Sequence, residues 1–232
     1  MERFLVWSDE FNTDGAPDAT KWGFDLGAGG WGNNESQTYT NSASNVVVQG
    51  GVLKITAKKE GSTYTSARLK SEDKYEFTYG KIEFRAKLPA GGGTWPAVWS
   101  LGQDYKTNSW PACGEIDFME HVGNSQNVIH GSLHYPGNSG GNANTASTTI
   151  ANASTEFHVY KTIWTPSSIK FYVDDKLFHS FSTLLFAFHM WSNHISVANQ
   201  STDNKMIVVS TSSRIKNDDS FASDSRSMRM KS

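Results

Sequence analysis

Short segments in which apolar and polar residues alternate recur along this sequence, and helical periodicity is almost absent. Side chains point to opposite faces along a β-strand, so a period of two residues predicts strands with one buried face. Leu53, Ile55 and Ala57 form one such set. Asp174 and Asp175 separate two apolar runs and predict the turn of a β-hairpin. The clearest alternating segments are residues 51–59, 79–88, 127–135 and 167–181.

Many short strands without helices predict an all-β fold, an antiparallel two-sheet β-sandwich of the jelly-roll type. A length of 232 residues suits one large all-β domain, which we place at residues 1–209. Residues 210–232 contain eight serines and a single aromatic residue, and they predict an irregular or disordered tail. The small polar residues of 137–147 predict an exposed, mobile loop.

The composition argues against several classes of protein. A net charge of −2 gives no electrostatic reason to bind nucleic acid or an anionic membrane. No apolar run approaches the roughly 18 residues of a transmembrane helix. Cys113 is the only cysteine, so an internal disulfide is impossible. The eight tryptophans are many for this length, and clefts that bind sugars use the flat apolar face of this side chain.

The N-terminal stretch MERFLVWSDEF is too short and too acidic for a signal peptide. Either the protein stays inside the cell or its signal peptide is absent from this sequence. We favour the second interpretation and expect a secreted or periplasmic protein that acts as a monomer.

The run GEIDFMEHVG places three acids, Glu115, Asp117 and Glu120, on an element that otherwise looks half buried. On a regular strand Glu115 and Asp117 share one face, but Glu120 points to the other. Burying a lone charge in the core is unfavourable. One extra residue, a β-bulge between Asp117 and Glu120, would return Glu120 to the face of the other acids. Ile116 and Phe118 would then fill the core.

Three crowded acids repel one another, so at least one should keep its proton to higher pH than usual. An ionised carboxyl paired with a protonated one is what retaining glycoside cleavage requires, at a separation of about 5–5.5 Å. Two other interpretations stay open. The acids could form a solvated face, or they could bind a divalent metal together with His121, His130 and His134. No spacing here matches a common metal motif, so we predict no metal site.

The sequence resembles glycoside hydrolase family 16, specifically the laminarinase-type endo-β-1,3-glucanases, over about residues 5–181. The form E-I-D-x-x-E is similar to the bulged subgroup, whereas the related lichenases have E-x-D-x-E on a regular strand. The matching runs are VWSDEFN (6–12), GGWGNNESQTYT (29–40), YTSARLKS (64–71), YGKIEFRAKLPAGGGTWPAVWSLG (79–102), WPACGEIDFMEHVGN (110–124) and HGSLHYPG (130–137).

The resemblance implies a jelly roll with a concave substrate cleft and a role for each acid. Glu115 corresponds to the nucleophile, Glu120 to the general acid and base, and Asp117 to an assisting carboxylate. The resemblance further implies substrate-binding residues. These are tryptophans that line sugar subsites, a histidine close to the cleavage point, and polar residues on the non-reducing side: Trp95, Trp99, Trp110, His134, Asn33, Glu35 and Arg68.

Each substrate-binding assignment has a simpler alternative. Trp95 and Trp99 lie four residues apart and face the same way on a strand, as sugar platforms would, but they could also be core residues. Asn33 follows a Gly-rich stretch and could serve only a turn. Arg68 could form a surface ion pair. Met119 could pack beneath a sugar ring or only fill space.

The C-terminal part departs from the family pattern from about residues 182–189 onward. The strand patterns F-x-L-N-x-A-V-G-G and D-Y-V-R-V-Y, usual in the family, are missing. We hypothesise a reading-frame shift in the gene, which translation in the other two frames would reveal. The loss of two strands predicts exposed sheet edges, for which Trp191, Ile195, Val197 and the run MIVV (206–209) could partly substitute. It also argues against the structural Ca²⁺ that bacterial members often carry with a ligand from the closing strand.

The favoured function is endo-acting, retaining hydrolysis of β-1,3-glucosidic bonds in laminarin-like glucans, with no cofactor required. A non-catalytic β-glucan-binding protein is a second candidate, because fold alone does not decide function. The pair Glu115 and Glu120 favours the enzyme, because a lectin would not need it. A transglycosylase is a third candidate, since it uses the same covalent intermediate.

Overall fold

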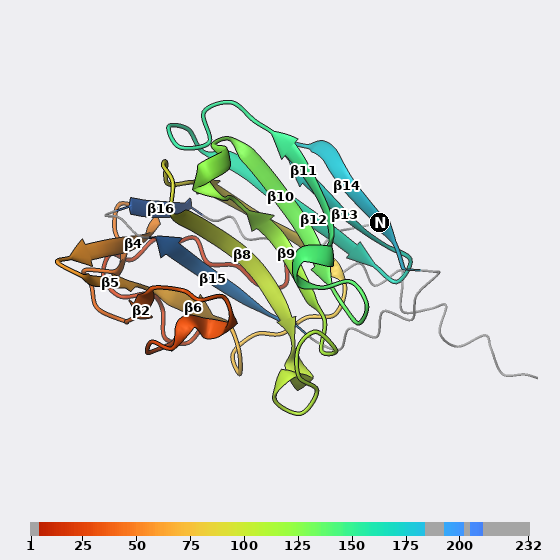
Figure 1. Ribbon diagram of the computed structural model, residues 1–232, viewed down its shortest axis with the longest axis horizontal. Helices are drawn as coiled ribbons and strands as arrows, with labels where there is room; N and C mark the ends of the chain where they lie inside the picture. The colour runs from red at the N-terminus through yellow and green to blue at the C-terminus, as the bar shows by residue number, and fades with distance from the viewer. Residues whose placement is uncertain (1–4, 184–192, 202–204, 211–232) are drawn as a thin grey trace, which may run out of the picture.

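The computed structural model describes residues 5–183, 193–201 and 205–210, which fold into two β-sheets packed face to face (Figure 1). Every strand pair is antiparallel except β2 with β5. The antiparallel sandwich predicted from the sequence is therefore confirmed. Short 3₁₀ turns occur at η1 (Gly30–Gly32), η2 (Gln103–Lys106), η3 (Gly123–Ser125) and η4 (Gly140–Asn142).

One sheet has seven strands and the other has nine among the described residues. In spatial order the first is β1 (Gly23–Asp25), β6 (Arg68–Lys70), β15 (Asn193–Ser201), β8 (Thr94–Gly102), β9 (Glu115–Glu120), β10 (Val128–His134) and β11 (Asn144–Thr149). The second is β14 (Lys176–Ser182), β13 (Ser168–Val173), β12 (His158–Thr165), β7 (Gly80–Lys87), β16 (Lys205–Ser210), β4 (Leu53–Glu60), β5 (Thr63–Ser66) and β2 (Gln37–Tyr39), with β3 (Val46–Val48) paired to β4.

The core lies between the sheets, where the predicted alternation places its apolar faces. Leu53, Ile55 and Ala57 of β4 are fully buried. On β7 the alternate residues Ile82, Phe84 and Ala86 are buried in the same way. The hairpin at Asp174 and Asp175 is also confirmed, because Val173 pairs with Lys176 across a two-residue turn. Both aspartates have positive φ, 46° and 64°, as a type I′ turn requires.

Within the described residues, two C-terminal strands occupy the places where exposed sheet edges were expected. β15 lies between β6 and β8, and β16 lies between β7 and β4, where Figure 1 shows both as blue arrows among earlier strands. Ile195 and Val197 are each 4% exposed and face the core, so their alternation supplies the apolar face of β15. The run MIVV (206–209) lies within β16. Trp191 lies outside the described residues.

Two further expectations concern segments near these strands. The loop predicted at residues 137–147 is shorter, because Asn144 already begins β11 and pairs with Leu133 of β10. Small polar residues allowed this edge strand because its outer face meets solvent. Ser210 ends β16, and the rest of the predicted tail lies outside the described residues, so the domain limits stay a prediction. Among the described residues, no helix is long and apolar enough to cross a membrane.

Candidate active site

A β-bulge interrupts β9 between Asp117 and Glu120. His130 of β10 lies opposite Glu120, and Ser132 lies opposite Asp117. The two partners on β10 are two residues apart, whereas the two acids on β9 are three apart. The same shift occurs against β8. The predicted bulge is confirmed, and it returns Glu120 to the face of Asp117.

The residues between the acids point into the core. Ile116 and Met119 are fully buried, and Phe118 is 2% exposed. Met119 therefore packs in the core and does not lie beneath a sugar. The extra residue explains this outcome, because without a bulge Met119 would have shared the face of Asp117.

Rows of directly opposed residues cross the outer face of the seven-stranded sheet, the face turned away from the core. Opposed residues on neighbouring strands point to the same side. One row is Asp25, Arg68, Ala198, Ala97, Glu120 and His130. A second row is Lys70, Ser196, Trp99, Asp117, Ser132 and Thr145. The catalytic candidates thus share one continuous surface with Arg68 and Trp99.

Glu115 lies at the start of β9, opposite Leu101 and His134. The indole Nε1–H of Trp110 donates a hydrogen bond of 2.6 Å to its Oε2. Burial, and then the nearby charge of Asp117, raises the pKa of Glu115 to about 8. The surroundings therefore disfavour the ionised form of this carboxyl, and Glu115 holds its proton to higher pH than an ordinary glutamate.

Asp117 is 4% exposed, whereas Glu115 and Glu120 are only half-buried. Burial, and then the charge of Glu120, raises its pKa well above the ordinary value. His134 Nε2 lies 3.0 Å from Asp117 Oδ2. The backbone N–H of Gly140 donates to His134 Nδ1 at 3.1 Å, so this ring nitrogen acts as an acceptor. Asp117 is the carboxyl best placed to keep a proton.

Glu120 accepts hydrogen bonds at both carboxyl oxygens. Trp95 Nε1–H donates to Oε1 at 3.0 Å, and the hydroxyl of Ser132 donates to Oε2 at 2.9 Å. Trp95 and Trp110 are 40% and 46% exposed, so each indole holds an acid while its ring remains open to a ligand. The acid cluster, which we define as Glu115, Asp117 and Glu120, is therefore flanked by two exposed aromatic faces.

Arg68 lies between two tryptophan rings. Its guanidinium carbon is 4.7 Å from the centre of the Trp99 ring and 5.0 Å from that of Trp31. Its Nε is 3.0 Å from Asp25 Oδ2. Trp99 is only 7% exposed, but it packs with Tyr39 in a small cluster separate from the main core. Trp99 is thus neither an open platform nor a core residue, and it supports Arg68 on the outer face.

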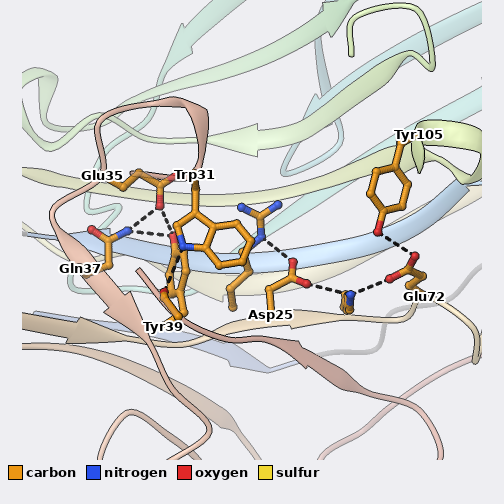
Figure 2. Close-up of polar contacts among 10 residues, drawn as sticks. Asp25, Trp31, Glu35, Gln37, Tyr39, Glu72 and Tyr105 are labelled. Atoms are coloured by element: carbon orange, nitrogen blue, oxygen red, sulfur yellow. Dashed lines mark hydrogen bonds and ion pairs between the residues drawn. The ribbon is translucent and has the colours of Figure 1, made fainter. Parts of the chain in front are cut away.

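Glu35 accepts hydrogen bonds from Gln37 Nε2 at 2.7 Å and from the Tyr39 hydroxyl at 2.6 Å. Figure 2 shows these three side chains beside Trp31. Burial is the largest influence on Glu35 and raises its pKa. Asn33 is exposed near the same carboxyl. The structure therefore brings Asn33 and Glu35 together and places them near Arg68 through Trp31.

Asp25 and Glu72 extend this region along the sheet (Figure 2). Lys70 Nζ lies 2.8 Å from Asp25 Oδ1 and 2.6 Å from Glu72 Oε2. Lys106 Nζ and the Tyr105 hydroxyl reach Glu72 Oε1 at 2.7 Å and 2.8 Å. We call the set Asp25, Arg68, Lys70, Glu72, Tyr105 and Lys106 the ion-pair row.

Several residues of the site were missed by reasoning from the sequence. Trp31, Gln37 and Tyr39 lie within the family-like run 29–40, but no role was predicted for any of them. The available signal for Trp31 was an aromatic residue between glycines. Ser132 and Thr145 gave no signal, because their partners come from other strands. In residues 5–183, 193–201 and 205–210, no group of three or more His, Cys, Asp or Glu side chains is arranged so that it could hold a metal ion. That the chain lacks the structural Ca²⁺ of its relatives stays a prediction.

A bulged strand that presents a nucleophile candidate, an acid candidate and a buried assisting carboxyl, all on the outer face of a β-sandwich, defines a glycoside-cleaving type of site. The sequence model of glycosyl hydrolases family 16 matches residues 33–187. The chain belongs to this family.

The relatives and solved structures agree with this assignment. The beta-glucanase of Rhodothermus marinus is 48% identical over 185 residues, which cover 76% of this chain. The chain spans 65% of that relative's length. The X-ray structure of the Rhodothermus marinus laminarinase superposes with a TM-score of 0.84 at 37% identity, covering 93% of this chain and 96% of that one.

A third comparison includes a bound sugar. A mutant of SCLam, a non-specific endo-β-1,3(4)-glucanase from family GH16 co-crystallised with 1,3-β-D-cellotriosyl-glucose, superposes with a TM-score of 0.85 at 31% identity. The match covers 94% of this chain and 95% of that one. Both structural matches span the sandwich from end to end, so the shared fold includes the strands that present the acids.

Proposed function

We propose that this chain is an endo-acting, retaining glycoside hydrolase that cleaves β-1,3-glucosidic bonds in laminarin-like glucans. The observation that carries the proposal is the bulge in β9, which gathers Glu115, Asp117 and Glu120 on one face. A glucan-binding protein would gain nothing from a buried, proton-sharing acid cluster. The names of the relatives from Rhodothermus marinus, beta-glucanase and laminarinase, support the same substrate class.

In the first step Glu115 attacks the anomeric carbon in its ionised form, which is the minority form below its pKa of about 8, and Glu120 gives its proton to the departing glycosidic oxygen. A covalent glycosyl-enzyme forms and the glycosidic bond breaks. Trp110 orients the nucleophile through its hydrogen bond to Oε2. Asp117 keeps a proton that it can share with Glu115, and this leaves the attacking oxygen ionised while limiting repulsion within the acid cluster.

In the second step Glu120, now ionised, takes a proton from water, and the water oxygen attacks the anomeric carbon. Glu115 leaves as a carboxylate, so each turnover restores both acids to their starting states. The two displacements invert the anomeric centre twice and retain its configuration. No cofactor takes part in these steps.

The contacts around the acid cluster support binding of an internal segment of a glucan chain, away from the ends of the glucan. Trp95 and Trp110 offer exposed rings beside Glu120 and Glu115. Arg68, between Trp31 and Trp99, continues the same face toward β1. On the other side of the acids, the Trp110 ring lies 5.6 Å from that of His134 on β10, so a sugar chain that crosses the strands would meet candidate binding groups on both sides, as endo cleavage requires. We further propose that the protein acts as a monomer in a secreted or periplasmic location.

The test is digestion of laminarin by the purified chain, followed by separation of the products and by proton NMR during the first minutes. We expect a mixture of oligosaccharides from the start, with the new reducing ends appearing first as the β-anomer. Glu60→Gln, at the exposed end of β4, is the matched control and should behave as the parent. Binding of laminarin without release of reducing ends would overturn the proposal in favour of a glucan-binding protein.

A further inference from the structure

A chain of hydroxyl groups reaches Glu120 from the edge of the sheet. Thr145 Oγ1 on β11 donates to Ser132 Oγ on β10 at 2.9 Å. Ser132 Oγ donates to Glu120 Oε2 on β9, also at 2.9 Å. Ser132 lies directly opposite Thr145 in the strand register, so the backbone pairing itself brings the two hydroxyls together.

The direction of the chain follows from the number of hydrogens. A serine hydroxyl has one hydrogen to donate. Because Ser132 accepts the hydrogen of Thr145, its own hydrogen points to Glu120. The other oxygen of Glu120 is held by Trp95 Nε1–H, which can only donate. Each carboxyl oxygen thus has one lone pair taken and one left, and the plane of the carboxyl is fixed by two donors from different strands.

Ser132 is 3% exposed, whereas Thr145 lies on the exposed side of its strand. The buried hydroxyl is covered by its neighbours and has little surface to offer a sugar. Any effect of Ser132 on the reaction must therefore pass through Glu120, which its hydroxyl contacts.

We propose that Ser132, oriented by Thr145, is a positioning residue for the acid and base Glu120; this inference rests on the proposed function. During the first displacement the proton leaves Glu120 for the glycosidic oxygen, and the Ser132 hydrogen bond stabilises the carboxylate that remains. During the second displacement a proton from water returns to Glu120. Ser132 keeps its own hydrogen throughout.

The first experiment measures kcat and KM on laminarin for Ser132→Ala and Ser132→Thr. We expect Ser132→Ala to lower kcat about 10- to 100-fold with little change in KM, because a misplaced acid impairs the chemical step. Ser132→Thr keeps the hydroxyl and should recover most of that loss. The control is Ser100→Ala on β8, a fully buried serine whose hydroxyl has no hydrogen-bond partner among the described residues.

The second experiment separates positioning of the acid from a general structural role. A 2,4-dinitrophenyl β-glycoside of laminaribiose has a leaving group that needs no proton, so its first displacement does not depend on the general acid. We expect Ser132→Ala to keep near-parent kcat/KM on this substrate while it loses activity on laminarin. Thr145→Val should show the same split in a milder form, with Thr149→Val, at the other end of β11, as its control.

The results of these experiments distinguish the positioning role of Ser132 from the proposed hydrolase function. If the parent cleaves laminarin and Ser132→Ala cleaves it equally well, the positioning role is wrong and the proposed function stands. Equal losses on both substrates would also overturn the role, because they would show that the hydroxyl serves the fold. If Ser132→Ala does not fold, Thr145→Val at the exposed edge gives the deciding comparison. A parent that releases no products overturns both proposals.

Discussion

The acid cluster and the ion-pair row lie on the same face of one sheet, but the pKa of Glu115 in the first and that of Glu72 in the second are shifted in opposite directions. In the acid cluster, burial and like charges raise the pKa of Glu115 to about 8. In the ion-pair row, burial acts on Glu72 in the same sense, but hydrogen bonds from Lys106, Lys70 and Tyr105 outweigh it and lower its pKa to about 2. Similar carboxyls therefore become a reactive group in one place and a fixed charge in the other.

The carboxyls of the acid cluster and those of the ion-pair row differ in whether a cation lies beside them. The structure gives the acid cluster no Lys or Arg ion-pair partner within its described residues, and the histidine beside Asp117 has its Nδ1 occupied by Gly140. Asp25 and Glu72, in contrast, alternate with cations along the row. A carboxyl without a cation can exchange a proton near neutral pH, whereas a paired carboxyl can hold its neighbours in place.

The largest expected effect is the loss of catalysis when a carboxyl of the acid cluster is replaced, compared with a carboxyl of the ion-pair row. Glu115→Gln removes the nucleophile while keeping the shape of the side chain, and we expect kcat/KM on laminarin to fall on the order of 10⁴-fold or more. Glu72→Gln changes a carboxyl of the ion-pair row in the same way and should cost less than about tenfold, because it only loosens a positioned cation. Steady-state assays of both variants with the parent measure the two losses. Losses of similar size would show that the division of roles is wrong.

Much of the acid cluster could be predicted from the sequence because its constraints are local. The alternation of β9, together with the unfavourable burial of Glu120, required a bulge, and the structure has one. The hairpin at Asp174 and Asp175 is equally local. Both features depend only on residues adjacent in the chain, whose faces follow from a period of two.

The ion-pair row and the hydroxyl chain could not be predicted because they depend on strand order. Arg68 meets Asp25 because β6 pairs with β1, and it reaches the acid face because β15 enters between β6 and β8. The departure from the family pattern predicted exposed sheet edges here, for which residues such as Ile195 and Val197 could only partly substitute. The alternation of Ile195 and Val197 was sufficient to fill it, since a strand needs an apolar face and not a particular sequence.

A smaller effect is expected on substrate binding when Arg68 of the ion-pair row is replaced. Arg68→Lys keeps the charge but loses the planar group that stacks between Trp31 and Trp99. We expect KM for long β-1,3-gluco-oligosaccharides to rise about tenfold with kcat nearly unchanged, because a cation–π contact is worth about 0.5–2 kcal/mol. Lys59→Arg, on the other sheet, is the control. A fall in kcat at constant KM would place Arg68 with the acid cluster instead.

The smallest effect concerns stability, and it tests the electrostatic contrast without reference to activity. Glu115 binds its proton more tightly in the folded chain than its ordinary value of 4.5. Between about pH 4.5 and 8 the folded state therefore holds a proton that the unfolded state lacks, and the free energy of unfolding should fall as pH rises through this window. The slope for one group is at most about 1.4 kcal/mol per pH unit. Urea unfolding of the parent at a series of pH values measures it, and Glu115→Gln should reduce the slope to the part that Asp117, whose pKa is also raised, contributes.

Glu72 should give the opposite slope in a different window. Its lowered pKa means that the unfolded chain takes up a proton first as pH falls from about 4.5 toward 2, so the free energy of unfolding falls with decreasing pH there. Glu72→Gln should reduce this acid-side slope and leave the slope between pH 5 and 8 as in the parent, because Glu72 is ionised in both states across that range. Glu72→Gln could instead reduce the slope of the unfolding free energy between pH 5 and 8, as Glu115→Gln is expected to do. Both carboxyls would then belong to one coupled network, and the division between the acid cluster and the ion-pair row would be wrong.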